Sequence, residues 1–157
     1  MDKLVMDIRP GDNKYLHRDF HVTGDNGLKY VGERYGDNGV REYLTTFAKA
    51  YYKPLFEAYR KEGLQALLDQ QKKLYEDEEM PEVFHAELTE DSLTVTVDRC
   101  PAVTFMRSHG YEPSRWYIEM TRTVNMVIAD ELDLGFTLEY YNEEDGACKY
   151  RYFRRAF

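Results

Sequence analysis

The sequence predicts an α+β protein: N-terminal helices packed on an antiparallel sheet of about four strands, built from two β-hairpins separated by two helices. Three observations predict this class. Residues 40–51 and 64–75 show the apolar spacing of amphipathic helices. Residues 83–100 and 136–157 alternate apolar and polar side chains around turn sequences, as hairpins do. The interval 101–135 between them returns to helical spacing.

The N-terminal part contains one tetrapeptide twice. Gly-Asp-Asn-Gly occurs at 24–27 and at 36–39, after a polar lead over 1–14. These residue types favour tight turns, so we expect a turn at each copy. Asp37 or Asn38 of the second copy is the expected N-cap of the helix that follows.

The helix after the second copy is expected to run from about residue 39 to Gly63. Pro54 lies inside it and predicts a kink near Tyr52–Lys53. Gly63 is the expected C-cap. A second helix is expected from Leu64 to Tyr75, before a charged connector over 76–82.

The C-terminal half supplies the predicted sheet. "TEDS" is the turn of the first hairpin and "NEEDG" the turn of the second. Between them, a short helix is expected over 101–110 and a longer one over 113–135, with Ser114 as its N-cap. The longer helix carries an apolar stripe from Trp116 to Leu132. With 157 residues, we expect one domain over 1–157.

The composition excludes several classes of function. The net charge is −8, which argues against nucleic acid as a partner. No run of 18 apolar residues occurs, so we expect no membrane span, and the N-terminus does not read as a signal peptide. The chain has only two cysteines, which predicts a cytoplasmic protein with reduced thiols.

Cys100 is the first candidate for chemistry. Pro101 follows it as the expected first residue of a helix, which places Cys100 at the N-cap. Backbone N–H groups and the positive end of the helix dipole stabilise a thiolate there. The alternative is a small residue packed at a strand-to-helix corner. Cys148 lies in a hairpin and is expected to be structural.

The segment "LHRDFH" offers His17, Asp19 and His21. On a helix the two histidines share a face, four residues apart. Either is a candidate general base. Zinc needs three or four ligands and no further cluster lies nearby, so the segment predicts no metal site. Ordinary surface histidines are the alternative.

The segment "EMTRTVN" predicts a polar row on one helix. Glu119, Arg122 and either Thr123 or Asn125 lie three or four residues apart. Such a row lines a pocket if Arg122 holds a substrate carboxylate through two parallel hydrogen bonds. The alternative is a solvated face with a Glu119–Arg122 pair. No motif for a nucleotide or a dinucleotide occurs, and no cofactor is predicted.

Several segments together resemble a known family. "HRDFH", "YGDNGVREYLTTFAKAYYKPL", "CPAVTFMRSHGYEPS", "EMTRTVN" and "GFTLEYYNEEDGACKYRYFRR" resemble L-2-amino-thiazoline-4-carboxylic acid hydrolases over residues 15–155. Met120 stands where that family more often carries threonine. The order of elements is also similar to 4-vinyl-reductase and TRAPP-like ligand-binding domains, an analogy at the level of fold alone.

The resemblance implies a hydrolase that opens a cyclic amidine with water. Such a reaction needs a base, a group that stabilises charge and an anchor for the substrate carboxylate. Arg122 suits the anchor, and His17, Asp19 or His21 suits the base. Cys100 either attacks the ring carbon or borders the pocket.

Two further hypotheses stay open. The first is a non-catalytic ligand-binding or sensor module with a pocket lined by Tyr and Phe. The second is an interaction module whose aromatic surplus of 14 Tyr and 8 Phe forms a homodimer face. The hydrolase and the ligand-binding module both imply a small-molecule partner.

Overall fold

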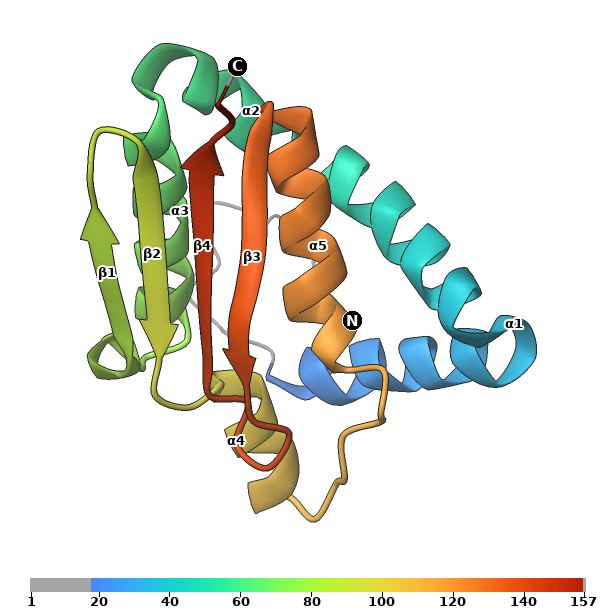
Figure 1. Ribbon diagram of the computed structural model, residues 1–157. Helices are drawn as coiled ribbons and strands as arrows, with labels where there is room; N and C mark the ends of the chain where they lie inside the picture. The colour runs from blue at the N-terminus through green and yellow to red at the C-terminus, as the bar shows by residue number, and fades with distance from the viewer. Residues whose placement is uncertain (1–17, 157) are drawn as a thin grey trace, which may run out of the picture.

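A computed structural model describes residues 18–156 and confirms the α+β class (Figure 1). The described part contains five α-helices, a short 3₁₀ helix and one four-stranded antiparallel sheet. The elements are α1 (Asp19–Tyr51), α2 (Lys53–Glu62), α3 (Leu64–Asp77), η1 (Pro81–Val83), β1 (Phe84–Leu88), β2 (Ser92–Val97), α4 (Pro101–Ser108), α5 (Ile118–Glu131), β3 (Leu134–Tyr141) and β4 (Cys148–Arg154).

Two hairpins build the sheet, as predicted, with α4 and α5 between them in the chain. The strand order is β1-β2-β4-β3, so the hairpins meet through the central pair β2 and β4. In that pair Leu93 lies opposite Tyr152 and Val97 opposite Cys148. Both pairs point their side chains to the same face, because side chains alternate along a strand.

One face of the sheet is covered by α3 and α5 (Figure 1). Leu93, Val95 and Tyr152 on the strands are completely buried there. The residues that alternate with them, such as Lys149 and Arg151, are exposed on the other face. This pattern of one buried and one solvated face is typical of antiparallel sheets. Among residues 18–156, no helix is long and apolar enough to cross a membrane.

The prediction of a turn at residues 24–27 is wrong, because α1 runs through this segment without interruption. The physical reason is a tertiary contact made by Asp25. Its carboxylate is completely buried and accepts hydrogen bonds from the backbone N–H and the hydroxyl of Ser114, both at 2.7 Å. These two bonds hold the helix against the loop before α5 and outweigh the turn preference of the glycines.

The second copy does interrupt the helix. Gly36 has φ 70° and ψ −169°, a conformation that residues with a β-carbon avoid, and α1 changes direction there (Figure 1). The Asp37 carboxylate then accepts hydrogen bonds from the Trp116 indole at 2.8 Å and from Arg115 at 3.1 Å. The Trp116 ring packs directly on Gly32, where a β-carbon would lie 2.3 Å from it. This contact fixes the bend against α5.

Other predicted helix ends are partly confirmed. The break near Tyr52 is present, with α2 starting at Lys53 and Pro54 in its first turn. Gly63 is the C-cap of α2 with φ 64°, as predicted. The prediction that Ser114 caps α5 is wrong: α5 begins at Ile118, because Ser114 donates to Asp25 instead.

Candidate functional site

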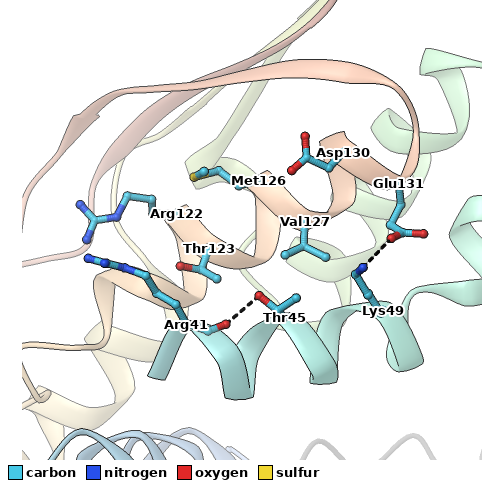
Figure 2. A pocket seen from close by; sticks show the side chains of 9 residues that line it. All are labelled: Arg41, Thr45, Lys49, Arg122, Thr123, Met126, Val127, Asp130 and Glu131. Atoms are coloured by element: carbon cyan, nitrogen blue, oxygen red, sulfur yellow. Dashed lines mark hydrogen bonds and ion pairs between the residues drawn. The ribbon is translucent and has the colours of Figure 1, made fainter. Parts of the chain in front are cut away.

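A groove of about 540 Å³ lies between the second half of α1 and α5 (Figure 2). Arginine, lysine and threonine come from α1, and charged, hydroxyl and apolar side chains come from α5. The described lining residues are Arg41, Thr45, Lys49, Arg122, Thr123, Met126, Val127, Asp130 and Glu131.

Helical spacing explains why these residues face the groove. Arg41, Thr45 and Lys49 follow one another at intervals of four and so form one row on α1 (Figure 2). The neighbouring row, Leu44 and Ala48, is almost completely buried in the core. The buried row fixes the rotation of α1, and the polar row therefore lines the edge of the helix contact.

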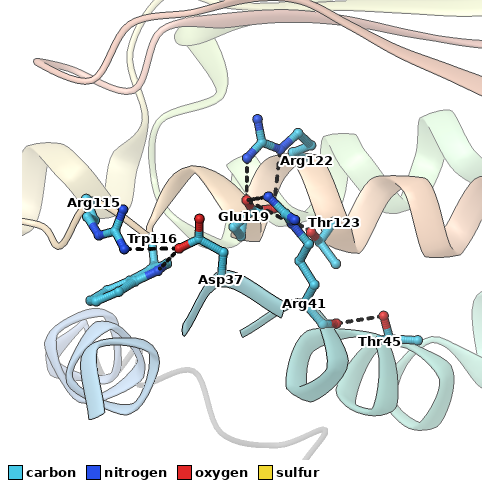
Figure 3. A network of polar contacts seen from close by, with 8 residues as sticks. All are labelled: Asp37, Arg41, Thr45, Arg115, Trp116, Glu119, Arg122 and Thr123. Atoms are coloured by element: carbon cyan, nitrogen blue, oxygen red, sulfur yellow. Dashed lines mark hydrogen bonds and ion pairs between the residues drawn. The ribbon is translucent and has the colours of Figure 1, made fainter. Parts of the chain in front are cut away.

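Glu119 lies buried at one end of the groove, with 3% of its surface exposed. Its carboxylate accepts a hydrogen bond from Thr123 at 2.5 Å and two from Arg122, at 3.3 Å from Nε and a shorter one from Nη2 (Figure 3). Arg41 approaches the same carboxylate at 3.5 Å. Burial acts to raise the pKa of Glu119, but these hydrogen bonds and charges outweigh it, and the pKa lies below its ordinary value. Glu119 is therefore a carboxylate in the folded protein.

Arg41 and Arg122 each contact Glu119 on one side and are accessible to solvent on the other. The Arg41 and Arg122 side chains are 47% and 40% exposed. Within residues 18–156, neither Nη1 atom has a hydrogen-bond acceptor. Both guanidinium groups lie at the same end of the groove (Figure 2), where they can donate to an anion.

The surrounding charges leave this end positive. Three guanidinium groups, those of Arg41, Arg115 and Arg122, face two carboxylates, those of Asp37 and Glu119 (Figure 3). A hydrogen bond from Trp116 and the charge of Arg115 lower the pKa of Asp37, so both acids are ionised. One positive charge remains in excess.

The other end of the groove carries no excess positive charge. Lys49 lies 3.1 Å from Glu131, and Arg155 lies 2.6 Å from Asp130 and 3.5 Å from Asp133. The excess positive charge is therefore confined to the Arg41–Arg122 end. The groove also has an apolar part, formed by Val127 and by Met126, which is 48% exposed.

The predicted binding residues fall in two places. Arg122 lines the groove, and Glu119 holds it there. Asn125, predicted to bind substrate, does not line the groove, and its side chain is buried in the core. It accepts a hydrogen bond from the Tyr152 hydroxyl at 2.5 Å and donates one to the Thr121 carbonyl at 2.6 Å. Asn125 thus provides the hydrogen-bond acceptor that the buried Tyr152 hydroxyl needs.

Cys100 occupies the predicted N-cap of α4, with Pro101 as the first helical residue. The Cys100 β-carbon packs on Gly146, where an added β-carbon on the glycine would lie only 2.4 Å from it. The backbone N–H of Cys100 donates a hydrogen bond to the Asp145 carbonyl at 2.8 Å. Burial raises the pKa of the Cys100 thiol, although the N–H groups of Val103 and Ala102 oppose that rise. The raised pKa keeps the Cys100 thiol protonated, unlike that of an activated nucleophile.

The "HRDFH" segment lies partly outside the described residues, because His17 is not among them. Asp19 is exposed in the first turn of α1. His21 pairs with Glu78 at 3.0 Å and makes an edge contact with Phe105 of α4. His21 therefore approaches the helix that Cys100 caps, but of the described residues neither Cys100 nor His21 lines the groove at Arg122.

Sequence reasoning missed Arg41, Thr45 and Lys49. Their signal was present as a polar row with the same spacing as the apolar row beside it. The spacing of the row does not indicate which other helix it faces. In the part of the chain that the structure describes, no three His, Cys, Asp or Glu side chains are grouped so as to hold a metal ion.

Fold and site together define the class: an α+β protein with a charged groove between two helices. Comparisons with family models, with curated proteins and with solved structures found no match to this chain.

Proposed function

We propose that this protein binds a small carboxylate in the groove between α1 and α5, with Arg122 and Arg41 as the anchor. The observation that carries the proposal is the pair of half-exposed guanidinium groups on one buried carboxylate, Glu119. Glu119 holds one edge of Arg122 in place and leaves Nη1 directed away from the protein contacts. Ordering the donor in advance lowers the entropic cost of binding.

A carboxylate suits this arrangement better than other anions of similar size. The planar guanidinium group matches the two oxygens of a carboxylate, which then accepts two parallel hydrogen bonds. A single excess positive charge matches the single charge of a carboxylate. Binding without turnover is the function that the geometry supports best, because the groove's described lining contains no Cys or His.

The hydrolase that the family resemblance implies makes a different demand on the site. It needs a base or a nucleophile beside the carboxylate anchor. Asp130 and Glu131, the acids that line the groove, are each engaged in an ion pair. Cys100 lies in another part of the fold, with its β-carbon packed against Gly146. Ligand binding is therefore the proposal, and hydrolysis stays a prediction from the resemblance.

The test is a titration of the protein with propionate, followed by NMR chemical shifts. We expect saturable binding that weakens roughly 10-fold or more in Arg122→Gln, since a charged hydrogen-bonded contact contributes about 1.5–3 kcal/mol. Arg107→Gln is the matched control. Arg107 lies on α4, its side chain is 37% exposed against 40% for Arg122, and it too pairs with one glutamate, Glu112. Equal affinities for the wild type and Arg122→Gln would overturn the proposal.

A second assay separates binding from hydrolysis. The protein is incubated with 2-amino-thiazoline-4-carboxylate, and the solution is analysed for N-carbamoyl-cysteine. The proposal expects the thiazoline to bind and to remain unchanged. Formation of the ring-opened product, abolished in Arg122→Gln, would instead support the hydrolase.

A further inference from the structure

A second hollow of about 330 Å³ adjoins the groove on the side of the sheet. Met126 and Asp130 line both cavities, so they form the ridge between them. In Figure 2 these two side chains stand on the side of α5 that faces away from α1. The second hollow continues from this ridge to Phe136 of β3 and Phe153 of β4.

The second hollow combines apolar side chains, among them Ala129, with the ion pair of Asp130 and Arg155. The Phe153 ring lies over Gly135, where an added β-carbon would come within 2.3 Å of the ring. The ring can occupy this position because Gly135 has no side chain. Phe136 contacts the buried Tyr152 with ring centroids 5.3 Å apart. Gly135 lies opposite Phe153 and Phe136 lies opposite Tyr152, so the two phenylalanine rings flank the hollow from opposite faces of the sheet, at its β3 edge.

Met126 connects the two cavities. It is 48% exposed and lines both of them. A thioether side chain is flexible and adapts to apolar ligands of varied shape. Met126 lies one helical turn from Arg122, about 6 Å along the axis at 1.5 Å per residue.

We propose that the ligand's carboxylate carries an alkyl or aryl body, which crosses Met126 and enters the second hollow at the β3 edge of the sheet. This inference rests on the proposed function, since Arg122 and Arg41 hold the carboxylate. The groove volume supports it, because about 540 Å³ is the size of a site for a ligand much larger than a bare carboxylate. The ligand class is therefore a monocarboxylate with an apolar chain.

The experiment measures the affinity of straight-chain carboxylates from propionate to octanoate. Each methylene that becomes buried tightens binding roughly fourfold, at about 0.8 kcal/mol per CH₂. Met126→Gln removes the apolar bridge without adding charge and should abolish most of this gain. Met126→Leu should keep it, and so should Leu74→Gln, which changes an exposed apolar residue on α3.

The outcomes separate this inference from the proposed function. If octanoate binds no tighter than propionate while Arg122→Gln still weakens both, the apolar body is refuted and the carboxylate site stands. If the chain-length gain persists in Met126→Gln, or is lost in Leu74→Gln, the placement at Met126 is refuted. If no member of the series binds, both proposals are refuted.

Discussion

Replacing Glu119 by glutamine removes the one charge on which Arg122 and Arg41 converge. The substitution keeps the size of the side chain and one oxygen for the Thr123 hydroxyl. It takes away the anionic acceptor of Arg122 and turns an amide N–H₂ toward a guanidinium group. The positions of both arginines then lose their common support.

The expected loss of stability is about 2 kcal/mol. A hydrogen bond to a charged group contributes about 1.5–3 kcal/mol, and at least one such bond from Arg122 is lost. The partners are 40% and 47% exposed, so solvent screening keeps the loss below the 3–5 kcal/mol typical of a broken, fully buried pair.

Urea unfolding followed by circular dichroism measures this loss. With an m value of about 2 kcal/mol/M, the midpoint should fall by about 1 M urea. Glu131→Gln is the matched control on the same helix. Its carboxylate pairs with Lys49 but is 36% exposed, so it should cost less than about 0.5 kcal/mol. Equal midpoints for the two variants would refute the reasoning.

The effect of pH has a definite sign. The pKa of Glu119 is lowered by folding, so the folded state binds fewer protons than the unfolded state in the window between the two pKa values. The stabilisation is fully present above the unfolded value of about 4.3 and is lost as the pH falls through the folded value. The gap between wild type and Glu119→Gln should therefore close in acid. A gap that stays constant down to pH 2 would contradict this assignment.

Two further predictions concern glycine and cysteine. Gly32→Ala should destabilise the protein by about 1–2 kcal/mol and shift the emission of Trp116, the chain's only tryptophan, because the new methyl group meets its ring. Gly24→Ala, in open space on the same helix, should instead stabilise by about 0.5–1 kcal/mol, and equal signs would argue against the packing. In a Cys148→Ala background, Cys100 should react with a thiol reagent more than tenfold slower in the folded than in the unfolded protein, since burial raises its pKa. Rapid labelling at neutral pH would contradict this.

The sheet was predictable from sequence because its signals are local. Alternation of period two and turn residues identify both hairpins, and no long-range information is needed for either. Pro54 and Gly63 likewise mark the limits of α2, since each acts through its own backbone. The α+β class follows from the order of these elements.

The errors all involve contacts between distant parts of the chain. Asp25 and Ser114 are 89 residues apart, and their hydrogen bonds both keep residues 24–27 helical and delay the start of α5. Asn125 has the spacing of a pocket residue, yet it pairs with the buried Tyr152 of a later strand. Local propensity does not contain such partners.

The aromatic surplus is divided between core and surface. Tyr75, Tyr150 and Tyr152 are buried, whereas Tyr43 and Tyr51 are exposed along α1. The homodimer face stays a prediction. The candidate site was half predictable: Glu119 and Arg122 lie three residues apart on one helix, but Arg41 joins them only because the bend at Gly36 sets the second half of α1 against α5.

The most direct test of the carboxylate site observes the arginine side chains themselves. In ¹⁵N-labelled protein, the Nε–H resonances of Arg41 and Arg122 are assigned with the single glutamine variants and followed as hexanoate is added. The account predicts that these two resonances shift together and saturate with one dissociation constant, while that of Arg107 on α4 stays in place. If hexanoate instead shifts the resonances around Cys100 and His21 and leaves Arg41 and Arg122 unchanged, the site lies elsewhere and the account is contradicted.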